Sequence, residues 1–151
     1  MKAVIQRTLT PATVKVDDTV TGRIDKGLIV YLGIGKEDTE EDIAWLAKKI
    51  VQMRIFSDEA GKMNLNVEQI GGGLLVISQF TLYASTKKGN RPSYLNSASP
   101  DLAKDLYNRF IEHTTTHYRL PVESGIFAAD MKVEYINDGP VTILMDTKNK
   151  E

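Results

Sequence analysis

The chain has 151 residues, of which 19 are Lys or Arg and 20 are Asp or Glu, so its formal net charge is −1. This length suits one domain, and the near-neutral charge excludes a protein that binds nucleic acid as a bulk polycation. The absence of Cys excludes disulfides, thiolate catalysis and Cys-based zinc sites. The sequence shows neither an apolar run of membrane-spanning length nor a signal-peptide pattern, so we expect a cytoplasmic protein that binds no membrane.

The first half of the chain predicts three strands and a helix. Residues 12–16 alternate apolar and polar side chains, as a half-buried strand does, and 20–24 form the returning strand of a hairpin. Residues 28–32 are apolar throughout, which is typical of a strand covered on both faces. A helix follows, for which Asp38 or Thr39 is the predicted cap. The residues expected on its buried face are Ile43, Leu46, Ala47 and Ile50.

The second half begins with another buried strand and continues to a long helix. Residues 74–77 are apolar and run into the polar segment 78–81. Ser99 before Pro100 is a strong helix start, because Ser caps helices and Pro is favoured at the first helical position. The residues expected on the buried face of this helix are Leu102, Ala103, Leu106, Phe110 and Ile111.

Two strands close the chain. The pattern predicts them at residues 131–135 and 141–145, joined by a turn at 137–140. Two helices among about seven strands indicate one α+β domain, which we place at residues 1–147 with a polar tail at 148–151.

Three patterns fall short of known metal and cofactor sites. His113 and His117 have zinc-ligand spacing but lack the Glu of a protease motif, so an exposed helix end explains them. The pair Gly33 and Gly35 lacks the third glycine of a dinucleotide-binding loop. Residues 71–73 precede a strand instead of a helix, so they do not form a phosphate-binding loop. We therefore expect no metal and no cofactor.

A polar segment at the end of a buried strand is chemically more informative. Ser78, Gln79, Phe80 and Thr81 stand where a scaffold can present hydroxyls, an amide and unpaired backbone N–H groups together. A Ser/Thr turn that ends a strand explains the same residues.

A basic loop follows this segment. Lys87, Lys88 and Arg91 lie close together beside Tyr83 and Tyr94, a composition that suits RNA phosphates and a stacked base. A solvated surface loop has the same composition, so both interpretations stand.

Residues 78–82 and 137–142 together resemble the two signature motifs of the D-aminoacyl-tRNA deacylases. Further segments resemble the same family in the same order, namely residues 3–7, 54–58, 61–65, 91–93 and 125–131. The likeness covers essentially the whole chain, and its length also fits the family.

The resemblance implies a homodimeric hydrolase that cleaves the ester between a D-amino acid and the terminal adenosine of tRNA. It also implies an antiparallel or mixed sheet that curls towards a barrel. In the family a cis Gly-Pro pair enters the partner subunit's pocket, and this pair corresponds to Gly139 and Pro140. Their carbonyl oxygens would bind the substrate's α-ammonium and leave no room for an L side chain, so glycyl-tRNA would be hydrolysed too.

The resemblance assigns further binding residues. It implies that Arg7 supports the Gly-Pro turn and that Phe127 and Met131 contact the substrate. The residues expected to bind tRNA are Lys87, Lys88 and Arg91.

Thr81 occupies the position proposed as the family's nucleophile. An alcohol needs an adjacent base, and no His lies near Thr81 in the sequence. We therefore expect a water molecule to attack the ester with help from the adenosine 2′-hydroxyl. The N–H groups of Phe80 and Thr81 would bind the oxyanion, and Gln79 and Ser78 would orient the ribose and ester.

Two other functions remain open at this point. A non-catalytic nucleic-acid-binding module would use the loop at residues 87–91 and bind without turnover. A hydrolase of another ester or of peptidyl-tRNA would accept L substrates. Neither function needs the chirality gate implied at Gly139 and Pro140.

Overall fold

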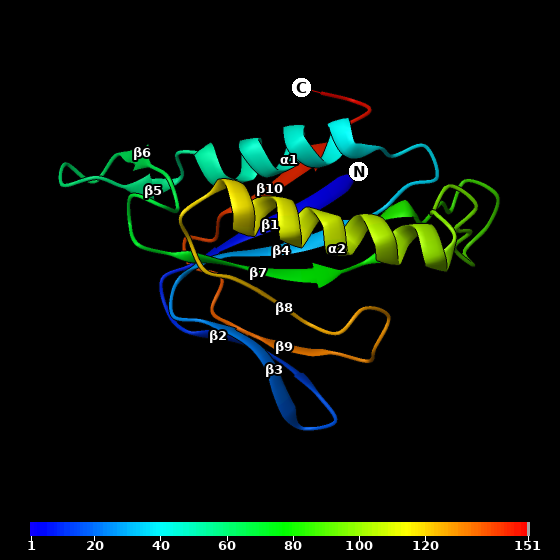
Figure 1. Ribbon diagram of the computed structural model, residues 1–151, viewed down its shortest axis with the longest axis horizontal. Coiled ribbons are helices and arrows are strands. Elements are labelled where there is room, and N and C mark those ends of the chain that lie inside the picture. Colours follow the sequence, from blue (N-terminus) through cyan, green and yellow to red (C-terminus); the bar gives the residue numbers. More distant parts are fainter. Residues whose placement is uncertain (151) are drawn as a thin grey trace.

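A five-stranded mixed sheet forms the centre of the computed structural model, which describes residues 1–150 (Figure 1). Its strands lie in the order β10 (Thr142–Asp146), β1 (Lys2–Thr8), β4 (Gly27–Gly33), β7 (Gly73–Ser78) and β8 (Val122–Ser124). Strand β1 is antiparallel to both neighbours, whereas β4, β7 and β8 are parallel to one another. The end of β7 and the start of β10 therefore lie at opposite ends of the sheet. The last residue of the predicted tail, Glu151, lies outside the described residues.

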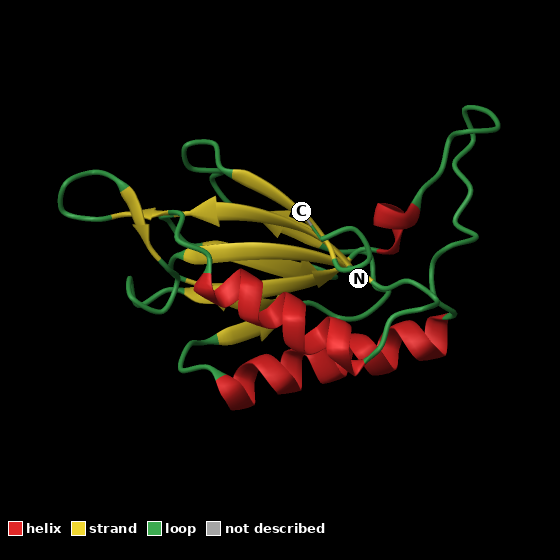
Figure 2. Cartoon of the chain, turned by 90° about the horizontal axis from the view of Figure 1, so that it is seen from above, coloured by secondary structure: helices red, strands yellow, loops and turns green. Residues whose placement is uncertain are grey.

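Two helices, α1 (Glu40–Gln52) and α2 (Pro100–His117), cover one face of this sheet (Figures 1 and 2). Both begin where the sequence predicts, with Thr39 as the N-cap of α1 and Ser99 before α2. The Asp42 carboxylate accepts a hydrogen bond from the Thr39 N–H at 2.8 Å, which stabilises the first turn of α1. Within residues 1–150, no helix combines the length and the apolar composition needed to cross a membrane.

A three-stranded sheet lies on the opposite face of the central sheet (Figure 1). Its strands are β3 (Thr19–Ile24), β2 (Ala12–Val16) and β9 (Lys132–Glu134). Alternate side chains of β4 and β7 consequently enter two different cores. Val30 and Val76 pack with the helices, whereas Ile29 and Leu75 pack with the second sheet. This arrangement explains why residues 28–32 are apolar at every position.

The structure corrects the expected fold in two respects. The central sheet does not close into a barrel, because β10 and β8 remain its edges and the second sheet stacks on it. The described chain also has ten strands instead of about seven. Strand β1 was not predicted, because only three apolar residues, Ala3–Ile5, stand between Lys2 and Gln6, too few to show an alternation. Strands β5 (Phe56–Ser57), β6 (Met63–Leu65) and β8 are too short to show an alternation.

Candidate active site

A cavity of about 330 Å³ lies at the carboxyl end of β7. It is lined by five of the residues that the sequence and the family resemblance select, which are Ser78, Gln79, Phe80, Phe127 and Met131. The other lining residues are Tyr31, Leu32, Ile34, Ile77, Ala103, Ala128, Ala129 and Val133. A mainly apolar wall with a few polar groups is typical of a small-molecule site. Thr81 follows Phe80 in the chain but is not part of the lining.

The chain leaves β7 through a short 3₁₀ helix, η1 (Phe80–Tyr83). The Gln79 N–H is bonded back to β4 at 2.8 Å, and the Leu82 N–H bonds the Gln79 carbonyl at 3.3 Å. The N–H groups of Phe80 and Thr81 lie between these two donors. In the described part of the chain they have no hydrogen-bond acceptor, as is usual for the first N–H groups of a helix. Two adjacent unpaired donors therefore stand beside the cavity.

The Thr81 hydroxyl accepts a hydrogen bond from the Gln79 side-chain amide at 2.5 Å. An amide is not a base, so this contact orients Thr81 without activating it as a nucleophile.

The two histidines lie far from η1. They occupy the end of α2, which leads to the start of β8 at the other end of the sheet (Figure 1). The rings of His113 and His117 stack, with their centroids 4.0 Å apart. Within residues 1–150, no group of three or more His, Cys, Asp or Glu side chains is placed to hold a metal ion.

Residues 125–131 form another wall of the cavity. The Ala128 N–H donates to Ser78 Oγ at 3.5 Å. The Phe127 ring packs against Tyr107 of α2, with the ring centroids 5.6 Å apart. A segment about fifty residues further along the chain is thereby joined to the end of β7.

Tyr31 brings to the cavity a hydroxyl that the sequence analysis did not select. Its hydroxyl donates to the Tyr135 hydroxyl at 3.4 Å. Burial and this hydrogen bond raise the pKa of Tyr31, so the hydroxyl stays protonated and keeps its hydrogen bond to Tyr135. In the sequence Tyr31 stands within an apolar strand, where nothing distinguishes it from a core residue.

Gly139 and Pro140 form an exposed turn before β10 and are joined by a cis peptide bond. Buried Arg7 donates from Nε to the Asp138 carbonyl at 3.2 Å and from Nη1 to the Ile55 carbonyl at 2.6 Å. Its Nη2 lies 3.5 Å from the Asp138 carboxylate. Arg7 thus holds the residue before Gly139 at two points.

The start of β10, which follows this turn, and the end of β7, which borders the cavity, lie at opposite ends of the sheet (Figure 1). Gln6 of β1 pairs with Thr142 on one side and with Ile29 of β4 on the other, and Ile29 pairs with Leu75 of β7. Thr142 and Leu75 therefore lie at the same level along the strands. Pro140 precedes this level by two residues, and Ser78 lies three residues beyond it. Strands β10 and β7 are separated by three interstrand spacings. With a rise of about 3.3 Å per residue and about 4.8 Å between neighbouring strands, the distance between Pro140 and Ser78 is roughly 20 Å. Gly139 and Pro140 do not reach the cavity of their own chain.

Lys87, Lys88 and Arg91 lie on an exposed loop that follows η1. Two backbone hydrogen bonds between Ser85 and Ser93, of 2.8 and 2.9 Å, close the base of this loop. Figure 2 shows the loop projecting away from the sheets and helices. The three cations therefore lie on an exposed loop that begins soon after the end of β7.

The two tyrosines predicted beside this loop lie in different environments. The Tyr94 ring contacts the ring of Phe80 edge to face, with the centroids 4.9 Å apart. Tyr83 instead donates its hydroxyl to the buried carboxylate of Asp38 at 3.4 Å. Burial and the Asp38 charge raise the pKa of Tyr83, so it stays a donor. This contact ties Tyr83 to the turn at Asp38, whereas Tyr94 lies beside Phe80.

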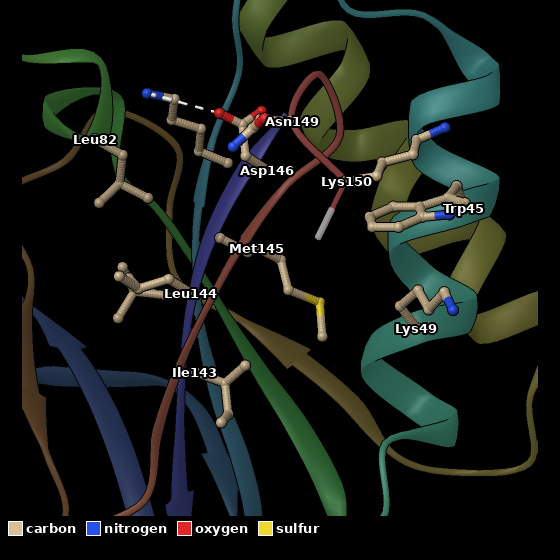
Figure 3. Close-up of a pocket in the computed structure, with 12 residues that line it drawn as sticks. Trp45, Lys49, Leu82, Ile143, Leu144, Met145, Asp146, Asn149 and Lys150 are labelled. Carbon is tan, nitrogen blue, oxygen red and sulfur yellow. Dashed lines mark ion pairs between the residues drawn. The ribbon is translucent and has the colours of Figure 1, made fainter.

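A larger cavity, of about 720 Å³, lies between α1 and β10 and contains none of the selected residues (Figure 3). Trp45 lines it from α1 and Met145 from β10, while Leu144 projects from the other side of β10. Lys2 and Asp146 form an ion pair of 3.9 Å at its end. We regard it as a groove along the free edge of the sheet, since β10 is an edge strand.

The family model described as D-Tyr-tRNA(Tyr) deacylase matches residues 4–146. A D-aminoacyl-tRNA deacylase of Parabacteroides distasonis is 53% identical over 151 residues and covers 100% of both chains. One from Fervidobacterium nodosum is 54% identical over 148 residues and covers 98% of each chain.

Two solved structures are also similar. One is described as c-Myc DNA Unwinding Element Binding Protein, with a TM-score of 0.91 and 38% identity over 97% of this chain and 99% of that one. A probable eukaryotic D-amino acid tRNA deacylase has a TM-score of 0.81 at 16% identity, covering 95% and 98%, so it shares the fold. From the family model and the relatives that match over their full length, the chain belongs to the D-aminoacyl-tRNA deacylase family.

Proposed function

We propose that this chain hydrolyses the ester between a D-amino acid and the 3′-terminal adenosine of tRNA, and that glycyl-tRNA is also a substrate. The observation that carries the proposal is the cavity beside the unpaired N–H groups of Phe80 and Thr81. An ester hydrolase needs such donors where the carbonyl oxygen becomes negative. We call these two groups the oxyanion donors.

In the proposed reaction a water molecule attacks the ester carbonyl carbon, and the adenosine 2′-hydroxyl assists in moving its proton. The oxyanion donors stabilise the negative oxygen, a contribution of roughly 2.7–4 kcal/mol per donor in other enzymes. The bond from the carbonyl carbon to the 3′ oxygen then breaks, and that oxygen leaves as a hydroxyl. Gln79 and Ser78 line the cavity and orient the ribose and the ester.

We infer that the active unit is a homodimer in which each cavity receives Gly139 and Pro140 of the other subunit. The roughly 20 Å between turn and cavity supports this, because the turn cannot serve the cavity of its own chain. Exposed apolar side chains lie just before the turn, on the edge strand β10 and at the cavity. Leu144, Ile136 and Phe80 are 75%, 62% and 57% exposed, and a second copy related by a two-fold axis would cover them.

The same turn is the proposed chirality gate. Carbonyl oxygens of Gly139 and Pro140 would form charge-assisted hydrogen bonds with the substrate's α-ammonium. Arg7 supports the turn through Asp138, which keeps it rigid enough to exclude an L side chain. Glycine has no side chain to exclude, so it should pass the gate.

Other parts of the chain complete the proposal. Phe127 and Met131 line the cavity and would contact the amino-acid side chain. The cations at residues 87, 88 and 91 would bind tRNA phosphates beside it. We assign the deacylase domain to residues 1–147 and the tail to 148–151. Because translation consumes aminoacyl-tRNA in the cytoplasm, we place the activity there.

Replacing Thr81 by Ala should leave kcat for D-Tyr-tRNA within about tenfold of the wild type, because Ala keeps the N–H donor. Thr81→Ser, which retains the hydroxyl, serves as the matched control and should behave like the wild type. Single-turnover kinetics with a saturating excess of enzyme measure the chemical step directly. A loss of about 10⁴-fold or more would instead make Thr81 the nucleophile.

Hydrolysis of D-Tyr-tRNA, L-Tyr-tRNA and Gly-tRNA, measured side by side with a chelator present, tests the proposed function. We expect turnover of the D and glycyl substrates and none of the L substrate. Equal rates for the D and L substrates would indicate an ester hydrolase without a chirality gate.

A second candidate is a nucleic-acid-binding module without catalytic activity. The exposed cations on the loop after η1 favour it, as does the DNA-binding description of one similar structure. This candidate predicts tRNA binding that weakens steeply with salt and no hydrolysis of any of the three substrates.

A further inference from the structure

The side chain of Gln6 binds the chain on both sides of the turn that carries Gly139 and Pro140. Its Oε1 accepts a hydrogen bond from the carboxamide of Asn137, two residues before Gly139. The same oxygen accepts a hydrogen bond at 3.1 Å from the hydroxyl of Thr142, two residues after Pro140. Thr142 also pairs with Gln6 in the sheet, so these two side chains lie on one face. One oxygen of β1 therefore joins the two ends of the turn.

The orientation of the Asn137 side chain depends on Gln6. Within residues 1–150, Asn137 Oδ1 is buried without a hydrogen-bond partner. An unpaired buried oxygen is unfavourable, so the hydrogen bonds of Nδ2 have to favour this orientation. Nδ2 donates to Gln6 Oε1 and also to Thr142 Oγ1, the latter at 3.4 Å. Turning the carboxamide over would bring Oδ1 against Gln6 Oε1, and both are acceptors.

Gln6 and Arg7 hold the turn from the two faces of β1. Consecutive residues of a strand point to opposite faces, and the Arg7 side chain binds the Asp138 carbonyl. The Arg7 backbone adds two hydrogen bonds, one from its N–H to the Val141 carbonyl at 3.1 Å and one from the Asp138 N–H to its own carbonyl at 3.0 Å. Residues 137–142 are thus bound at both ends, while the tip of the turn is exposed.

We propose that Gln6 is a positioning residue of the chirality gate, which sets the direction of the Gly139 and Pro140 carbonyl oxygens by joining the two ends of their turn. This inference rests on the proposed function of the turn. A hydrogen bond weakens when its acceptor is misaligned, so a displaced turn binds the α-ammonium less well. The same displacement opens space for an L side chain.

Gln6→Leu tests this proposal, because Leu is also unbranched at Cβ but has no acceptor. We expect kcat/KM for D-Tyr-tRNA to fall about tenfold and hydrolysis of L-Tyr-tRNA to rise above the uncatalysed rate. Gln6→Glu keeps an acceptor for both donors, so its kcat/KM should stay within about threefold of the wild type with the L substrate still excluded.

Gln69→Leu is the matched control. Gln69 Oε1 also stabilises a turn, by accepting the Asn66 N–H at 2.8 Å in the exposed segment between β6 and β7. Its substitution should change neither kcat/KM nor the exclusion of the L substrate.

Hydrogen exchange gives a readout that does not depend on activity. In the Gln6→Leu chain the Asp138 N–H, which bonds the Arg7 carbonyl, should exchange faster, while the amides of β4 keep their rates. The control Gln69→Leu should leave the rate at Asp138 unchanged. An inactive wild type would refute the proposed function, whereas an unchanged rate at Asp138 in the Gln6→Leu chain would overturn this inference alone.

Thr142→Val keeps the test decisive if the Gln6→Leu chain does not fold. It removes one of the two donors to Gln6 Oε1, so kcat/KM for D-Tyr-tRNA should fall about threefold. In the double variant the two effects should be less than multiplicative, since both substitutions break the same hydrogen bond. Wild-type kcat/KM and selectivity in Gln6→Leu, or equal losses in Gln6→Leu and Gln6→Glu, would overturn the proposal. If Gln6→Leu does not fold, wild-type kinetics of Thr142→Val overturn it.

Discussion

Replacing Gly139 by Ala is expected to lower kcat/KM for D-Tyr-tRNA about 10²-fold while the fold is retained. Gly139 has a φ of +122°, which favours glycine, and an added Cβ would lie 2.8 Å from Val141 Cγ2 and 2.9 Å from Arg7 Nη2. The turn has to shift to relieve these contacts. The shift moves the carbonyl oxygens that are proposed to bind the α-ammonium. Steady-state kinetics and thermal unfolding of the same preparation measure both effects.

Gly61→Ala is the matched control for this variant. Gly61 also has a positive φ, of +75°, but it lies in the turn between β5 and β6 with nothing within 4 Å of an added Cβ. Its substitution should reduce stability by about 1–3 kcal/mol through backbone strain, without lowering kcat/KM of the folded enzyme. Wild-type activity and D selectivity in the Gly139→Ala variant would show that the turn is not the chirality gate.

The second large effect is expected for Phe80→Pro, which removes one oxyanion donor. Phe80 is the first residue of η1, where Pro is tolerated because the N–H has no partner within the helix. We therefore expect the backbone of η1 to keep its conformation in this variant. We expect kcat to fall roughly 10²–10³-fold, as when one donor is removed from an oxyanion hole. Single-turnover rates at saturating enzyme measure this loss at the chemical step.

Phe80→Leu distinguishes the effect of the N–H donor on kcat from the effect of the aromatic ring. This variant loses the aromatic contact with Tyr94 but keeps the N–H group. Since an aromatic pair contributes about 0.5–1.5 kcal/mol, its kcat should stay within about tenfold of the wild type. Equal losses in the Pro and Leu variants would assign the effect to the ring and remove Phe80 from the proposed donors.

Elements with a strong local signal were predictable from the sequence. Thr39 and Ser99 mark the helix starts, because capping chemistry acts within one helical turn. The strand at residues 28–32 was recognisable because burial on both faces leaves no polar position. Strand β1 and the 3₁₀ helix η1 were not, because their form depends on neighbours that are distant in the sequence.

The candidate site was predictable only in part. The end of a buried strand points to Ser78–Thr81, and the family resemblance adds residues 125–131. The structure brings both segments to one cavity. No local pattern reveals the hydrogen bond of Asn137 with Gln6, which spans 131 positions. The distance between Gly139 and the cavity follows from strand order, which the sequence pattern did not supply.

The central claim is that two subunits build each active site, and mixed dimers of Gly139→Ala and Phe80→Pro chains test it most directly. Each variant alone should be nearly inactive. If the turn acts in the partner's cavity, a heterodimer has one site in which the turn and both donors are intact. Random reassembly of equal amounts should then restore about a quarter of wild-type activity, because half the dimers are mixed and half their sites intact. Activity no higher than that of the two parent variants, with heterodimers verified by native mass spectrometry, would contradict a shared site.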